Sequence, residues 1–290
     1  MVNDVKVQSP PQSDVHDNNG TNACDVNRGV KVVEYKCIVC HSFLKGLLWK
    51  CGLRGICLAA LWLPLGALIF CYVSASIFQA DDIHETHCRV YNVVPSISAI
   101  TGISPQRYIW RICIAFHLGP RLLIGSLYYN YHKERTAHIT QEKARILATR
   151  LGDACYWLNF IELFALTGVT YVSNRENYFV HEKIFIVFMV AALLHMLCRA
   201  RVGCIGNDAV EPVRTNKLVW ILFYVAIAAT LGLIVFFLRH RLLCRPLAFT
   251  WFSVCEYILA TTNMAFHAVV VRDLPLHQLQ VIGPNHIKTN

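Results

Sequence analysis

The sequence predicts an all-α fold, a polytopic membrane bundle of about six transmembrane helices. Of its 290 residues 55% are hydrophobic and only 16% are charged, and the mean hydropathy is +0.42. A soluble domain carries charge on about a quarter of its residues. The lysines and arginines stand in short clusters between long apolar runs, as they do in membrane proteins, and this distribution argues against a nucleic-acid binder despite the net charge of +9.

Six apolar runs are long enough, at roughly 18 residues or more, to cross the hydrocarbon core of a bilayer. They cover residues 55–79, 107–131, 152–173, 184–201, 218–238 and 246–271. The fourth run is the weakest, because Lys183 and Arg199 border it closely. Snorkelling of those two side chains would extend it to a full crossing.

The remaining segments divide the chain into three parts. Residues 1–44 are polar, lack the early apolar core of a signal peptide, and are expected to form a disordered cytosolic tail. Residues 45–275 are expected to form a six-span membrane domain, and residues 276–290 a second cytosolic tail.

The distribution of positive charge predicts that both termini are cytosolic. With six spans, 18 lysines and arginines fall on the side of the termini and 6 in the opposite loops, and cytosolic loops carry the excess. The last opposite loop, RHRLLCR, goes against this rule. Cys88 and Cys244 both fall in opposite loops, where they form either one disulfide in an oxidising compartment or two free thiols.

The second apolar run carries a stripe of costly side chains. With 100° per residue, Arg107, Arg111, His117, Arg121 and Tyr128 share an arc of about 120°. An arginine at the bilayer centre costs roughly 2.5–3.5 kcal/mol, so this face is expected to point to a cavity or a protein partner. For Arg107 and Arg111 the alternative is a place at the lumenal interface, with snorkelling side chains.

The sixth run repeats the pattern with a stripe made of Ser253, Glu256, Asn263 and His267. Because a lone carboxylate is costly in a membrane, Glu256 is expected to pair with an arginine or histidine of the second run. The third run has a looser polar face, made of Asn159, Glu162, Thr170 and Ser173. These faces predict a polar cavity among the second, third and sixth helices. Inter-helix contacts that only fix the packing are the alternative.

The residue types in these stripes suit an anionic phospholipid, because the planar fork of arginine matches phosphate. Acid–base capability deep in the membrane marks the predicted catalytic residues, His117, His267 and Glu256. Charge and hydrogen-bonding capacity mark the predicted substrate-binding residues, Arg107, Arg111, Arg121 and Asn263.

No cofactor or metal is expected. The sequence contains no nucleophile elbow, glycine-rich phosphate loop or zinc-protease pattern. The stretch DDIHETHC, residues 81–88, has the residue types that bind zinc but not a specific spacing. It is expected to be a solvated acidic loop.

The block CRVYNVVPSISAITGISPQRYIWRICIAFHLGPRLLIGSLYYNYH, residues 88–132, resembles the post-GPI attachment to proteins factor 2 family, of the FRAG/DRAM type. The resemblance lies in NVVPS (92–96), PQRY (105–108), Trp110-Arg111, His117 and Pro120-Arg121. In weaker form it extends through the later runs, including NMAFH (263–267), and covers residues 45–275.

The resemblance implies a multi-pass protein of the Golgi, or of the endoplasmic reticulum, that acts in lipid remodelling of GPI anchors. In that pathway an unsaturated chain is removed from the phosphatidylinositol of the anchor, and a saturated chain is then added to the lyso-lipid. The family is associated with the second step. The implied partners are GPI-anchored proteins and their phosphatidylinositol lipid, and the oligomeric state is left open.

Three functions stay open at this point. In the first, the protein is a membrane-embedded acyltransferase in which the arginines hold the inositol phosphate, His117 or His267 is the general base, and Glu256 orients that base. In the second, it is a non-catalytic lipid-presenting or scaffold protein that supports a separate acyltransferase. In the third, it regulates lysosomal or autophagic membranes.

Overall fold

The structure is a computed structural model that describes residues 47–86, 88–90, 92–205, 213–273 and 278–282. The expected disordered tail, residues 1–44, lies outside the described residues. All the helices and strands reported below belong to one unit, Leu47–Asn290.

Six long helices make up most of the described chain. They are α1 (Leu53–Phe78), α4 (Gln106–Ala137), α5 (Glu142–Tyr171), α6 (Tyr178–Ile205), α7 (Val213–Leu243) and α8 (Ala248–Ala268). Three short helices are α2 (Ala80–His84), α3 (Ile97–Thr101) and α9 (Val270–Asp273). Strand β1 (Leu47–Gly52) pairs antiparallel with β2 (Gln278–Ile282). The all-α prediction is confirmed. The small sheet is an addition: β1 follows the expected N-terminal tail, and β2 lies in the expected C-terminal tail.

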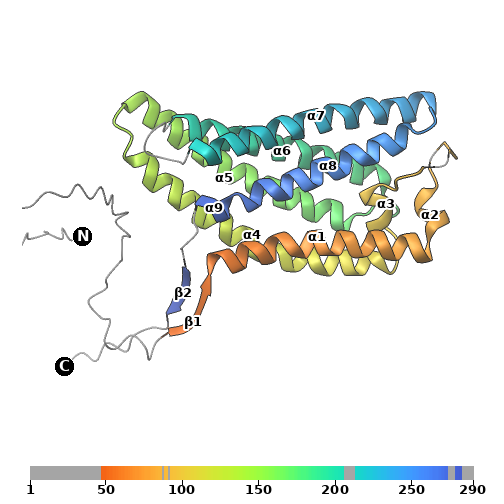
Figure 1. The fold of residues 1–290 in the computed structure, drawn as a ribbon, viewed down its shortest axis with the longest axis horizontal. Coiled ribbons are helices and arrows are strands. Elements are labelled where there is room, and N and C mark those ends of the chain that lie inside the picture. The colour runs from red at the N-terminus through yellow and green to blue at the C-terminus, as the bar shows by residue number, and fades with distance from the viewer. Residues whose placement is uncertain (1–46, 87, 91, 206–212, 274–277, 283–290) are drawn as a thin grey trace, which may run out of the picture. The chain divides into compact units, whose positions relative to one another are not determined.

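Five of the described helices, α1, α4, α6, α7 and α8, are long and apolar enough to cross a membrane. Helix α5 is not among these five, yet it packs between α4 and α6 along the bundle (Figure 1). The helices overrun the apolar runs: α5 begins at Glu142, ten residues before the predicted run. Hydropathy marks only the part of a helix inside the hydrocarbon, whereas helical hydrogen bonding continues beyond it.

The six long helices form a closed ring. Each packs on the next along the chain, α1 on α4, α4 on α5, α5 on α6, α6 on α7 and α7 on α8, and α8 returns to α1 (Figure 1). Apolar clusters hold the neighbours together, for example Met196, Val219 and Leu259 between α6, α7 and α8. A closed ring gives every helix an inward face, where polar side chains are shielded from lipid.

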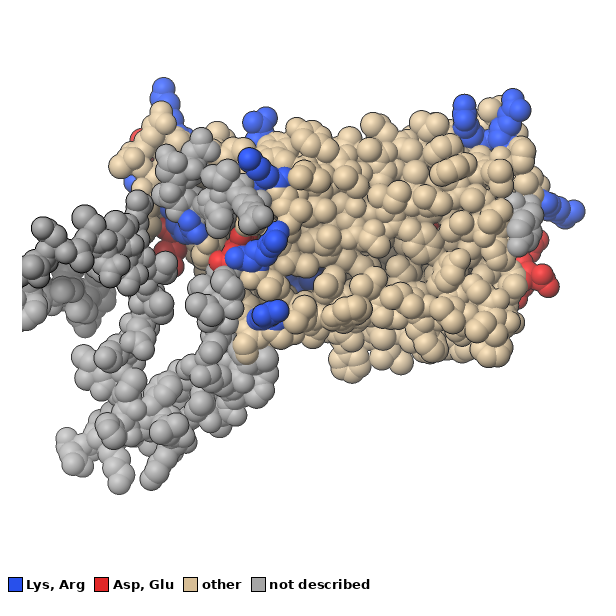
Figure 2. Space-filling view, viewed as in Figure 1, with Lys and Arg blue, Asp and Glu red and all other residues tan. Residues whose placement is uncertain are grey.

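The two ends of the ring differ. The disulfide end carries α2, α3 and the Cys88–Cys244 disulfide, so the disulfide alternative is the one that forms. The sheet end carries β1, β2 and α9. Figure 2 shows lysines, arginines and acidic residues gathered at both ends of this face, with a belt almost free of them between. Such a belt is expected where a protein meets the hydrocarbon of a bilayer.

Glu176, in the connection between α5 and α6 at the disulfide end, binds two arginines of α4. Arg107 Nη1 lies 3.1 Å from Oε1, and Arg111 Nη2 lies 2.6 Å from Oε2. The backbone N–H and the hydroxyl of Ser173 each donate to Oε2 at 2.9 Å. These two Ser173 hydrogen bonds, followed by Arg111, lower the pKa of Glu176 to about 2.

This lowered pKa predicts a pH-dependent contribution to stability. A carboxylate with a depressed pKa in the folded state stabilises the protein above its ordinary value of 4.5, and the contribution is lost as the pH falls towards about 2. Because the side chain is half-exposed, we expect Glu176→Gln to cost about 1 kcal/mol or less at pH 7. Thermal unfolding in detergent should show the full difference at pH 7 and only a small part of it at pH 2. A difference of equal size at both pH values would contradict it, and the exposed Glu134→Gln is the control.

Candidate functional site

The ring of helices encloses a cavity of about 170 Å³, lined by α1, α3, α4, α5, α6 and α8 together with Val219 of α7 and Val270 of α9. A single water needs only about 10–15 Å³ on the same measure. Residues of the second, third and sixth predicted helices meet on its wall, as the stripes predicted. Polar side chains line it at three levels, near the middle of the helices, beside α3 and toward the sheet end.

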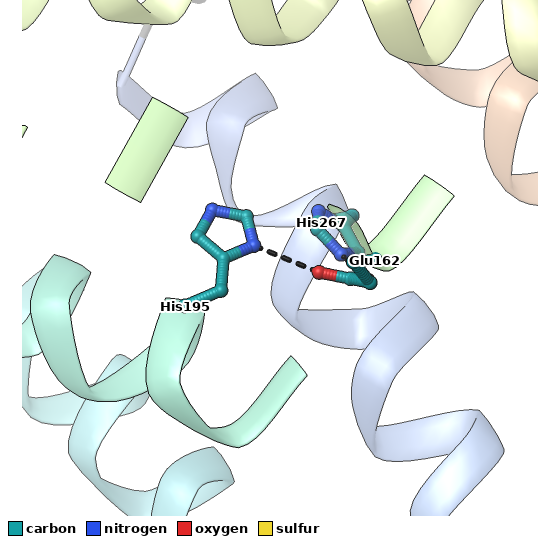
Figure 3. Close-up of side chains that lie close together, drawn as sticks. All are labelled: Glu162, His195 and His267. Atoms are coloured by element: carbon teal, nitrogen blue, oxygen red, sulfur yellow. Dashed lines mark hydrogen bonds and ion pairs between the residues drawn. The ribbon is translucent and has the colours of Figure 1, made fainter. Parts of the chain in front are cut away.

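The first group, the Glu162 cluster, consists of Glu162, Arg121, His195, Asn263 and His267. Glu162 Oε1 accepts hydrogen bonds from His267 Nε2 at 2.7 Å and Asn263 Nδ2 at 3.0 Å, and lies 3.5 Å from Arg121 Nη2. Glu162 Oε2 accepts from His195 Nδ1 at 2.8 Å. Figure 3 shows both imidazole rings turned toward the carboxylate. Four helices, α4, α5, α6 and α8, thus meet at one acidic side chain.

Burial explains why these side chains gather. The side chains of Arg121 and Glu162 are 6% and 2% exposed, and a charge so far from water is tolerated only beside an opposite charge and hydrogen-bond donors. Arg121 Nη2 also donates to Asn159 Oδ1 at 3.1 Å. Gly125 makes room for this contact, because a Cβ there would lie 2.5 Å from Asn159 Nδ2. Close approach of α4 and α5 therefore positions Arg121.

The hydrogen bonds fix the protonation pattern of the two histidines. An ionised carboxylate only accepts hydrogen bonds, so His267 donates from Nε2 and His195 donates from Nδ1. This leaves the lone pair of a neutral ring on Nδ1 of His267 and on Nε2 of His195. A neutral histidine held by a carboxylate has the arrangement of a general base.

Three members of this cluster also have the residue types of a metal site. The ligand atoms of Glu162, His195 and His267 lie within 4.8 Å of one another, and two histidines with one glutamate can bind zinc. However, Glu162 already balances the charge of Arg121, so a divalent ion would leave two uncompensated positive charges in a buried site. The arrangement therefore suits acid–base chemistry better. In the stretch 81–88, His87 lies outside the described residues, and Asp81 and Asp82 are exposed on α2.

His117 also lines the cavity, one helical turn from Arg121. Its Nδ1 lies 2.7 Å from the carbonyl oxygen of Ala60, a contact that links α4 to α1. Because a carbonyl accepts, Nδ1 donates and Nε2 keeps its lone pair. His117 is thus buried as predicted, but its hydrogen-bond partner is backbone and not a carboxylate.

The second group, the α3 polar group, consists of Glu256, Ser98 and His181. Glu256 Oε2 accepts a hydrogen bond from the backbone N–H of Ile97 at 2.9 Å. Ser98 Oγ lies 2.9 Å from His181 Nε2, and His181 Nδ1 lies 2.7 Å from the carbonyl oxygen of Val172. The Val172 carbonyl takes the ring N–H, so Ser98 donates to Nε2. These contacts tie α3 to α6 and α8.

The prediction that Glu256 pairs with an arginine or histidine of the second run is wrong. Its partner is the N-terminus of α3, where backbone N–H groups lack helical partners and favour a carboxylate. The acidic partner of Arg121 is Glu162 of α5. Spacing along one helix shows which side chains share a face, but not which neighbouring helix supplies the partner.

The structure also separates the arginines that the sequence grouped together. Arg121 joins the Glu162 cluster, whereas Arg107 and Arg111 bind Glu176 at the disulfide end. This position agrees with the alternative that places Arg107 and Arg111 at the membrane interface. Arg111 and Arg121 are ten residues apart, about 15 Å along a helix. Each of the two arginines is held by its own carboxylate. The predicted substrate-binding residues therefore form two separate pairs, Arg107 with Arg111 at Glu176 and Arg121 with Asn263 at Glu162.

Sequence reasoning left Glu162 and His195 out of the predicted site. Glu162 was placed only on a looser polar face, although it is the sole acidic residue between Asp153 and Glu176. The cost of a carboxylate in a membrane, which singled out Glu256, applies equally to it. That signal was present in the sequence. The sequence did not show that His195 points inward, because one histidine on an apolar helix does not define a polar stripe.

The closed ring and the buried Glu162 cluster define a polytopic helical membrane protein with a cluster of buried ionisable side chains among its helices. The chain belongs to the Frag1/DRAM/Sfk1/Cwh43P N-terminal domain family, whose family model matches residues 53–277. This match covers the six long helices and excludes the N-terminal 52 residues.

Curated relatives carry more specific names. The chain is 47% identical to "Post-GPI attachment to proteins factor 2-like" of Drosophila melanogaster, over 79% of this chain and 72% of the relative. It is 34% identical to "Acyltransferase PGAP2" of Xenopus tropicalis, over 77% and 87%. It is 31% identical to "Post-GPI attachment to proteins factor 2" of Caenorhabditis elegans, over 75% and 83%. No solved structure matches the chain.

Proposed function

We propose that the protein reacylates lyso-GPI with a saturated chain during lipid remodelling of GPI anchors. The observation that carries this proposal is the Glu162 cluster, an acid–base site inside an apolar-walled cavity of a membrane protein. The names of the relatives, which include an acyltransferase and post-GPI attachment factors, support the substrate class. GPI-anchored proteins and their phosphatidylinositol lipid are then the partners.

In the proposed reaction His267 is the general base. Its Nδ1 takes the proton of the lyso-lipid hydroxyl as the hydroxyl oxygen attacks the carbonyl carbon of an activated acyl donor, an ester or thioester. The donor's alcohol or thiol leaves and receives the proton back from His267. Glu162 holds the ring through Nε2 and stabilises the imidazolium that forms. Arg121 balances Glu162, and Asn263 fixes its Oε1.

The proposed location is the Golgi membrane, or that of the endoplasmic reticulum, with both termini cytosolic. The disulfide end then faces the lumen, where an oxidising environment keeps Cys88–Cys244 formed. The sheet end faces the cytosol, in agreement with the excess of lysine and arginine on that side.

The proposal is tested by His267→Gln in purified protein supplied with lyso-GPI and an acyl donor. Glutamine keeps a donor at the position of Nε2 but offers no basic nitrogen, so turnover is expected to fall by about 10²–10⁴-fold. The matched variant His195→Asn keeps the Nδ1 donor and is expected to retain turnover within about tenfold. Full activity in a folded His267→Gln protein would exclude His267 as the base, and a folded wild type without turnover would exclude the enzyme.

The alternative is a non-catalytic lipid-presenting or scaffold protein. It is favoured by the observation that Glu162 accepts hydrogen bonds from side chains of α6 and α8, as in a contact that fixes helix packing. In cells that lack this step, a scaffold carrying His267→Gln should restore the saturated chains of GPI-anchored proteins as well as the wild type does. An enzyme carrying it should not.

A further inference from the structure

We propose that the half of the cavity between the Glu162 cluster and α3 is an acyl-chain pocket, which takes one unbranched saturated chain with its carbonyl carbon at the Glu162 cluster. This inference rests on the proposed function, since it places the chain that the reaction transfers. The shape and chemistry of the cavity wall carry it.

The wall of this half is mainly apolar between His117, one helical turn from Arg121, and the α3 polar group. Each surrounding long helix that reaches it supplies an apolar side chain: Leu68 from α1, Ile114 from α4, Leu166 from α5, Phe188 from α6 and Leu259 from α8. An apolar space does not hold water well, and its lining lacks contacts on one side while it is empty. A hydrocarbon chain supplies those contacts without any polar partner.

The other half of the cavity, toward the sheet end, is different. Its lining includes the polar side chains of Tyr128, Tyr129, His132 and Arg199. An acyl chain would face hydroxyl, imidazole and guanidinium groups there, whose desolvation is costly. The contrast between the two halves therefore gives the chain a direction, from the Glu162 cluster toward the disulfide end.

The length of the apolar half suits a long chain. His181 and His195 mark its two ends on α6, and fourteen residues of helix span about 21 Å. An extended chain therefore has space along the pocket, and the rings of Trp110 and Phe185 line it.

The α3 polar group closes the far end of the pocket. Ser98 is bonded to His181, and Glu256 is bonded to the backbone of Ile97, so these polar atoms already have partners. A terminal methyl group cannot replace either bond, and breaking one would leave a buried polar group unsatisfied. The group is thus a stop that limits the length of the chain.

The experiment compares Ala260→Phe with Ala265→Phe, the same substitution at two positions of α8. Ala260 lines the cavity between Glu256 and His267, whereas Ala265 is exposed on the outer face of the ring. Purified protein receives lyso-GPI and an equimolar mixture of saturated acyl donors of different lengths, and the products are separated by mass. A second measurement is the chain length of the fatty acyl lipids that copurify with each variant.

Ala260→Phe should favour shorter chains. Excluding two methylenes, at roughly 0.8 kcal/mol each, corresponds to about a 15-fold fall in the ratio of long to medium chains. Ala265→Phe should match the wild type. Ala260→Leu, a smaller change, should shift the ratio in the same direction by less, and keeps the test valid if the phenylalanine variant does not fold.

Each outcome decides between the two proposals. Turnover with an unchanged chain profile in the Ala260 variants, or an equal shift in Ala265→Phe, would overturn the pocket and leave the proposed function intact. No turnover in the wild type, together with copurified chains that shorten in Ala260→Phe, would overturn the function and support the pocket. Neither turnover nor a bound chain would overturn both.

Discussion

Replacing Glu162 by glutamine is expected to lower the free energy of unfolding by about 3–5 kcal/mol and to abolish acyl transfer. The substitution keeps the size of the side chain but removes the acidic partner of Arg121, whose side chain is 6% exposed. A buried guanidinium without a counter-charge is among the most costly defects in a protein interior. Thermal or denaturant unfolding in detergent measures the stability, and product formation measures the activity.

A double variant separates the two effects. Combining Glu162→Gln with Arg121→Met removes both charges, so most of the lost stability should return, because an apolar replacement of a buried ion pair is often neutral or stabilising. Activity should not return, since neither histidine then faces a carboxylate. A double variant as unstable as Glu162→Gln would show that the ion pair is not what Glu162 stabilises. A stable and fully active one would remove Glu162 from the proposed mechanism.

The contrast between Glu162 and Glu256 shows what the sequence could and could not predict. Length and hydropathy predicted the positions of all six long helices. The 100° helical period predicted the inward direction of four side chains, Arg121, His117, Asn263 and His267. The partner of each buried charge depends on which helices are neighbours and how far each is shifted along its axis. Neither property is encoded in the period of a single helix, so Glu256 was paired with the wrong helix and Glu162 was missed.

Helix α5 shows that predictions from amino-acid composition have the same limit. Among the six long helices described, it alone lacks a stretch apolar enough for a membrane crossing, and its polar residues include the acid on which four helices converge. Its neighbours α4 and α6 cover the faces that carry Asn159 and Glu162, so the cost of these residues is met by protein contacts and not by lipid. A long helix that packs inside a membrane bundle but lacks a sufficiently apolar stretch is therefore a reasonable place to search for a site.

Replacing Asp273 by asparagine should produce the other large loss of stability, about 3–5 kcal/mol, and confine it to the sheet end. Asp273 Oδ2 lies 3.0 Å from Arg199 Nη2, with side chains 0% and 3% exposed. The hydroxyl of Tyr128 donates to the same oxygen at 2.5 Å and accepts from Arg199 Nε at 2.6 Å. These bonds hold α9 against α4 and α6.

Because the bonds of Asp273 meet at the sheet end, its loss should open that end before the rest of the ring. Hydrogen exchange in Asp273→Asn should accelerate in α9 and in the last turns of α6, while α3 and the disulfide end stay protected. The control Asp81→Asn alters an exposed acid on α2 and should leave both ends unchanged. Uniform acceleration through all six long helices would contradict a local role, because it would mean that this ion pair stabilises the whole bundle as one cooperative unit.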